Sequence, residues 1–315
     1  MYYYFLLFLA VVGIVITFCL GKKYQLILHG TTESVYLRML AVSVAEFPIF
    51  LAIANFKIRF DGYMLILSSI LALIALISML ITLAAYSKGN MIIYTMFQMA
   101  GGMLLPFVYG IAYGNNLSVW RIIGIVLMVF ALIFSVFKEL REAFGTGDRK
   151  GRIFLLLCVA IFFVNGSTSI VSYIYANGIY AASDYTPETG AFLVVNRIVT
   201  IVFSLVGLGL VALMHRGKPK EPSLDSKGNL MSVKRVVGWC LLLFLLMAGV
   251  DGVSAYLQLI SASAIPAVAI YPIITGGTVV LTGIAGFVFF HEKVTKRAVV
   301  SIILTFLSTV LFVFE

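Results

Sequence analysis

The chain carries ten long apolar runs separated by short polar turns, and this pattern limits its fold more than any other feature. A helix needs roughly 20 apolar residues to cross the hydrocarbon core of a bilayer. The runs cover residues 2–20, 34–54, 62–86, 91–113, 119–137, 152–175, 189–213, 236–259, 266–289 and 298–314. Charged residues make up only 11% of the chain, whereas they make up about 25% of an average soluble domain. The sequence therefore predicts an all-α integral membrane protein with ten transmembrane helices.

The net charge of +9 would suggest a nucleic-acid partner in a polar protein. Here the positive residues occupy short loops between apolar runs, which is typical of membrane topology. We therefore expect a lipid bilayer as partner and no nucleic acid. The cysteines lie inside apolar runs without metal-ligand spacing, and the histidines are scattered over loops. These residues are Cys19, Cys158 and Cys240, and His29, His215 and His291. We accordingly expect no metal site, no cofactor and no enzyme activity.

The second half of the chain repeats features of the first. An offset of 177 residues aligns Tyr94 with Tyr271, Asn115 with Glu292 and Ser118 with Thr295. The first and sixth runs are similar, and the second and seventh each carry one arginine. Because each half has five runs, the second half would enter the membrane in the opposite orientation. We predict two five-helix inverted-topology repeats, residues 1–138 and 152–315, joined by a linker loop at 139–151.

The distribution of Lys and Arg predicts the orientation in the membrane. Seventeen of them lie in the loops after the odd-numbered runs and three in the loops on the opposite side, at Lys57, Arg59 and Arg121. Loops rich in Lys and Arg stay in the cytoplasm, so both chain termini are expected outside. We expect a multi-pass protein of a bacterial plasma membrane.

Apart from Arg121 and Arg152 at the starts of their runs, four charged side chains lie inside the apolar runs, where each is unfavourable by about 2.5–3.5 kcal/mol on insertion scales. Glu46 is near the middle of its run and is expected either to bind substrate or a proton or to pair with a polar group of another helix. Arg38 lies near a helix end and is expected to have a gating or structural role. Arg197 and Asp251 either form an ion pair that joins two helices or face the substrate cavity.

Uncharged hydrogen-bonding side chains also interrupt the runs. Gln98, Asn165 and Tyr271 fit a pocket that orients a small polar solute, and they fit helix–helix contacts equally well. The glycine pairs Gly101-Gly102 and Gly276-Gly277 favour close helix packing, because no phosphate-loop spacing surrounds them.

The C-terminal region contains the pattern Tyr271-x-x-x-Thr275-Gly276, an apolar run and then the sequence FFHEK at residues 289–293. This pattern resembles the end of a subunit of the small multidrug resistance family, part of the drug/metabolite transporter superfamily. The resemblance implies a small organic solute that crosses through a central cavity, with Tyr271 and its repeat mate Tyr94 facing that cavity. The chain departs from this family because residues 2–20 contain no acidic residue. It also departs from ten-span relatives, whose termini are usually cytoplasmic.

The sequence as a whole favours a secondary transporter that moves a zwitterionic, amino-acid-like metabolite by alternating access. Both signs of charge inside the membrane suit such a solute. The substrate site is expected to include Glu46, Tyr94, Gln98, Asn165, Arg197, Asp251 and Tyr271. The alternatives are a transporter of a cation such as choline or a lipophilic amine, and a flippase for a lipid or a lipid-linked sugar. A proton or sodium ion is the expected coupling ion, and the protein is expected to be a monomer or a weak homodimer.

Overall fold

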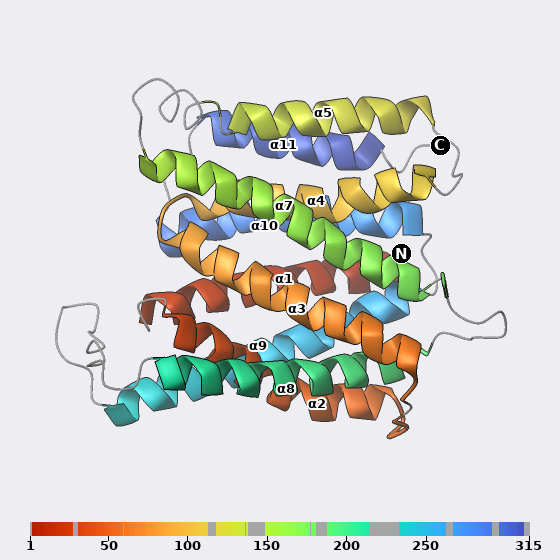
Figure 1. Cartoon of the computed structure of the whole chain (residues 1–315). Helices are drawn as coiled ribbons and strands as arrows, with labels where there is room; N and C mark the ends of the chain where they lie inside the picture. The colour runs from red at the N-terminus through yellow and green to blue at the C-terminus, as the bar shows by residue number, and fades with distance from the viewer. Residues whose placement is uncertain are drawn as a thin grey trace. The chain divides into compact units, whose positions relative to one another are not determined.

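The protein is described here from a computed structural model. The structure describes residues 2–27, 31–58, 60–112, 118–135, 137, 149–176, 178–180, 188–214, 233–262, 267–291 and 296–311. All regular secondary structure in this part of the chain is helical (Figure 1). The helices are α1 (Tyr2–Ile27), α2 (Thr32–Ile53), α3 (Gly62–Tyr86), α4 (Met91–Ala112), α5 (Val119–Ser135), α7 (Arg149–Ala176), α8 (Thr189–Met214), α9 (Val233–Ala262), α10 (Ala267–Phe290) and α11 (Lys296–Leu311).

Each predicted apolar run coincides with one of these helices. The largest difference is at α1, which continues past Lys22 and Lys23 to Ile27, beyond the predicted end at residue 20. Lysine side chains near a helix end can reach away from hydrocarbon while the backbone stays helical. The Lys23 ammonium lies 5.5 Å from the centre of the Trp239 ring, which is close enough for a cation–π contact.

By length and composition, eight helices in the described part of the chain can cross a membrane. The protein is therefore a multi-pass α-helical membrane protein. The two remaining helices are shorter, with 17 residues in α5 and 16 in α11. At 1.5 Å per residue they are about 25 Å long, slightly less than the hydrocarbon thickness of about 30 Å.

Polar side chains satisfy backbone groups where several helices begin. The Thr31 hydroxyl accepts a hydrogen bond from the Ser34 amide at the start of α2. Asp61 accepts one from the Met64 amide at the start of α3, with a distance of 2.7 Å. Such caps pair amide groups that have no partner within the helix.

The chain divides into two compact units. Unit 1 comprises residues 1–15, 84–173 and 254–315. Within it α4 packs against α10, α5 packs against α11, and α10 packs against α11. Residues of α4, α5 and α10 form its hydrophobic core, in which Met96 and Met128 have no exposed surface. The Ser308 hydroxyl donates a hydrogen bond to the Gly124 carbonyl, joining α11 to α5.

Two helices of unit 1 approach closely because of glycine. A Cβ atom added at Gly101 of α4 would overlap the Phe162 carbonyl of α7. A Cβ atom at Gly166 of α7 would likewise overlap the side chain of Leu105. The Gly101 contact agrees with the predicted close packing at this position, since small residues let membrane helices approach each other.

Unit 2 comprises residues 16–83 and 174–253. Its main contact joins α2 to α8 along most of their length. At one end Gly190 lies against Ala54, and at the other Gly207 lies against the Tyr36 ring. Residue numbers fall on α2 as they rise on α8, so the two helices are antiparallel.

Candidate functional site

The antiparallel packing of α2 and α8 sets the position of a charged cluster in unit 2. Gly190 contacts Ala54, and Gly207 contacts Tyr36. The register between these two contacts places Arg197 of α8 at the level of Glu46 of α2. The two glycines let α8 approach α2 closely at both ends, against the Ala54 backbone and the Tyr36 ring, and these contacts fix the register.

Arg197 lies between two carboxylates. Its Nε atom is 3.0 Å from Glu46 Oε2, and its Nη2 atom is 3.9 Å from Asp251 Oδ2 of α9. The guanidinium also lies 5.1 Å from the centre of the buried Phe50 ring, one turn along α2 from Glu46. Arg197 is therefore held by charge on one side and by an aromatic face on the other.

The cluster is buried at one end and accessible at the other. Only 1% of the Glu46 side chain is exposed, compared with 23% for Arg197 and 38% for Asp251. Gly252 helps to place Asp251, because a Cβ atom there would lie 3.1 Å from two carbons of Ile49 on α2. The guanidinium and Asp251 are therefore partly exposed, whereas Glu46 is buried.

Arg38 belongs to the same electrostatic group. It interacts electrostatically with Glu46, as do Arg197 and Asp251. Its guanidinium packs against Gly21 of α1, where a Cβ atom would lie 2.7 Å from two guanidinium nitrogens. When all four side chains are ionised, their charges sum to zero, which is the least unfavourable arrangement inside a membrane.

The predicted uncharged site residues belong to unit 1. The Asn165 side chain of α7 donates a hydrogen bond of 2.6 Å to the main-chain carbonyl of Gln98 on α4. Asn165 thus serves helix packing in this structure, which is one of its two predicted roles. Tyr94 is fully buried and its ring contacts the Tyr86 ring edge-on, with 5.3 Å between centroids. The side chain of Tyr271 lies outside the described residues.

The second glycine pair lies at contacts of α10 with two neighbours. A Cβ atom at Gly276 would overlap the Thr309 hydroxyl of α11, and one at Gly277 would lie 3.1 Å from Val11 of α1. Both glycines therefore lie where α10 approaches a neighbouring helix closely.

The structure adds two features that the sequence did not predict. The sequence left open whether Arg197 and Asp251 form an ion pair or face the cavity. Their side chains approach to 3.9 Å, but Glu46 is the nearer partner of Arg197, at 3.0 Å. Phe50 was not a predicted site residue, because an aromatic residue in an apolar run is not distinguishable from its neighbours. Among the described residues, no three His, Cys, Asp or Glu side chains gather as metal ligands would.

Comparisons with known proteins do not extend these observations. The sequence matches no protein-family model, and no curated protein is significantly similar to it. The resemblance to the small multidrug resistance family therefore depends on the C-terminal pattern and the helix layout.

Proposed function

We propose that the protein is a secondary transporter for a zwitterionic, amino-acid-like solute. The observation that carries the proposal is the placement of Arg197 between Glu46 and Asp251 on three membrane-spanning helices. Ionisable residues inside a membrane face the bundle interior or a water-filled cavity and mark substrate or ion pathways. The exposure of Asp251 and the guanidinium supports a pathway role over a purely structural one.

The geometry favours a specific way of binding. The longer, 3.9 Å contact between Arg197 and Asp251 is the easier one to exchange. A substrate carboxylate would take the place of Asp251 on the guanidinium, since Arg binds carboxylates through paired donors. The substrate ammonium would then pair with the released Asp251 carboxylate. A zwitterion leaves the net charge of the cluster unchanged, whereas a lone cation or anion does not.

Transport would follow from alternating access between two inverted five-helix repeats. This arrangement is supported by the packing of α2 with α8, α4 with α10 and α5 with α11. In each pair, one helix is the repeat mate of the other under the predicted duplication. A pseudo-symmetric pair of halves lets the same contacts rearrange toward either side of the membrane. Glu46, the most buried charge, would carry the coupling proton.

A transporter of quaternary ammonium cations is the main alternative. It needs carboxylates that are free to pair with the substrate. Both acids here share Arg197, so this alternative requires the arginine to move away. A flippase would instead use Arg197 for a lipid head group.

The test is a thermal stability screen of the purified protein against amino acids, quaternary amines and lipophilic cations. A ligand present at 100 times its dissociation constant stabilises the folded state by about 2.7 kcal/mol, which raises the melting temperature. We expect a zwitterion to do so in the wild type and not in the Asp251→Asn variant. Asp61→Asn is the matched control, because Asp61 caps α3 and belongs to no part of the cluster.

Three outcomes separate the functions. Stabilisation by a zwitterion that Asp251→Asn abolishes and Asp61→Asn retains supports the proposal. Stabilisation by quaternary amines alone would support the cation transporter in place of the proposal. Stabilisation by a zwitterion in both variants would mean that Asp251 is not part of the substrate site.

A further inference from the structure

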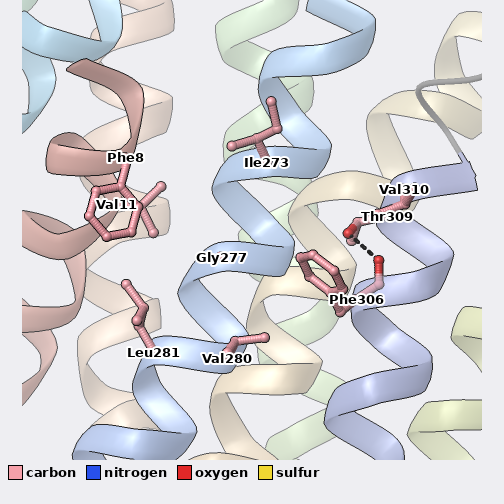
Figure 2. Close-up of a pocket in the computed structure, with 9 residues that line it drawn as sticks. All are labelled: Phe8, Val11, Ile273, Gly277, Val280, Leu281, Phe306, Thr309 and Val310. Atoms are coloured by element: carbon pink, nitrogen blue, oxygen red, sulfur yellow. Dashed lines mark hydrogen bonds between the residues drawn. The ribbon is translucent and has the colours of Figure 1, made fainter. Parts of the chain in front are cut away.

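Unit 1 contains an apolar groove of about 360 Å³ between α1, α10 and α11. Figure 2 shows its walls, with Phe8 and Val11 on α1 and Phe306 extending from α11. On α10 the lining runs from Ile273 to Leu281. At 1.5 Å per residue this is a length of about 12 Å along the helix axis. The groove therefore extends at least this far along α10.

A second groove of about 370 Å³ lies in the same unit between α4, α5 and α7. Four of its nine lining residues correspond to lining residues of the first groove under the offset of 177 residues. The corresponding lining pairs are Leu104 and Leu281, Val129 and Phe306, Leu132 and Thr309, and Ile133 and Val310. The two grooves thus lie at equivalent positions of the predicted repeats, so that each repeat contributes the same pair of helices to one groove.

The linings are chemically uniform. All side chains that line either groove are apolar except Thr309. The Thr309 hydroxyl donates a hydrogen bond of 2.7 Å to the Phe306 carbonyl of its own helix, drawn as a dashed line in Figure 2. A ligand with polar groups at this depth would lose its hydrogen bonds to water without replacing them. The grooves therefore select a ligand that is apolar along its whole buried length.

Both grooves open at the apolar surface of unit 1. Exposed apolar side chains form their rims, including Phe8 and Phe306 at the first and Val159 and Phe163 at the second. The walls α1, α4, α7 and α10 are membrane-spanning helices. The medium at these openings is consequently hydrocarbon.

We propose that each of these two grooves binds one acyl chain of a membrane phospholipid. An acyl chain is linear, apolar and parallel to the helices, which matches the shape, the lining and the direction of both grooves. This binding does not depend on what the protein transports.

The test fills each groove with a bulky side chain. Ile133→Trp and Val310→Trp place an indole at equivalent positions of the two grooves. Phe130→Trp and Leu307→Trp are matched controls, because these residues lie three positions earlier on the same helices, are exposed and line neither groove. All variants are purified from bilayers of palmitoyl-oleoyl phosphatidylcholine, and native mass spectrometry counts the phospholipids that remain bound.

We expect the wild type and both controls to retain the same number of phospholipids. Each groove variant should retain one fewer than the wild type, and the double variant should retain two fewer. Equal retention in groove variants and controls overturns the proposal. The proposal is also overturned if the wild type carries no lipid and forms a dimer in which a second copy covers the two grooves.

Photo-cross-linking of the wild-type protein tests the same proposal without depending on whether the variants fold. Phosphatidylcholine with a photoreactive diazirine on its acyl chain is incorporated into vesicles that contain the protein. We expect cross-links concentrated at groove residues such as Val280 and Leu155. Labelling that is equally strong at Val126 and Leu156, which are exposed but outside both grooves, contradicts specific binding.

Discussion

Glu46 is buried, and the nearest atom of Arg197 lies 3.0 Å from its carboxylate. Removing one partner of a buried ion pair leaves an uncompensated charge, which destabilises a protein by about 3–5 kcal/mol. We therefore expect Arg197→Ala to lower the free energy of unfolding by about 3 kcal/mol. Unfolding in mixed micelles with increasing SDS, followed by circular dichroism, measures this change.

The double variant Glu46→Gln, Arg197→Ala serves as its control. It removes the unpaired charge, so its free energy of unfolding should recover most of the loss seen in Arg197→Ala. If both variants lose the same amount, the loss is due to packing of the arginine against Phe50, and the two charges are not coupled.

The charged residues of the site could be predicted one by one, whereas their pairing could not. Glu46, Arg197 and Asp251 are conspicuous because a charge is unfavourable in an apolar run. Which of them are partners depends on the register of α2 on α8. That register is set by Gly190 and Gly207, and nothing in the sequence says what each glycine contacts.

At the scale of the elements, apolar runs predicted the helices closely because a membrane helix must satisfy all its backbone groups internally. The contacts between helices needed the structure. Gly101 illustrates this, since the sequence suggested close packing but did not identify α7 as the neighbour. The same holds for Asn165, whose hydrogen bond to α4 could not be distinguished from a role in a pocket.

The α4–α7 contact predicts a difference between two glycine substitutions. Gly101→Ala should lower the free energy of unfolding by about 1–3 kcal/mol, because the new methyl group overlaps a backbone carbonyl that cannot move alone. Gly249→Ala is the matched control in α9, where a Cβ atom meets nothing within 4 Å. There we expect no loss, and a gain of up to about 1 kcal/mol from the better helix propensity of alanine. Equal effects in both variants would mean that α4 and α7 are not in tight contact.

For the whole molecule, the decisive question is whether α5 crosses the membrane. It has only 17 residues, yet the inverted-repeat proposal requires it to span. A crossing of this length is possible if the bilayer thins locally, which is unfavourable by fractions of a kcal/mol per Å of mismatch. If α5 spans, four helices separate residues 57 and 188, so both residues lie on the same side.

Single cysteines in a variant without the three native cysteines test this arrangement. Lys57→Cys and Glu188→Cys probe the side with few basic residues, and Ser87→Cys and His291→Cys probe the other side. All four residues lie in turns or at helix ends. An impermeant maleimide added to intact cells should label positions 57 and 188 and leave positions 87 and 291 unlabelled, because loops rich in Lys and Arg stay in the cytoplasm. The reverse pattern would keep the ten spans and place both termini in the cytoplasm. Labelling of only one of positions 57 and 188 would mean an odd number of crossings between them, and the two halves would then not be inverted copies.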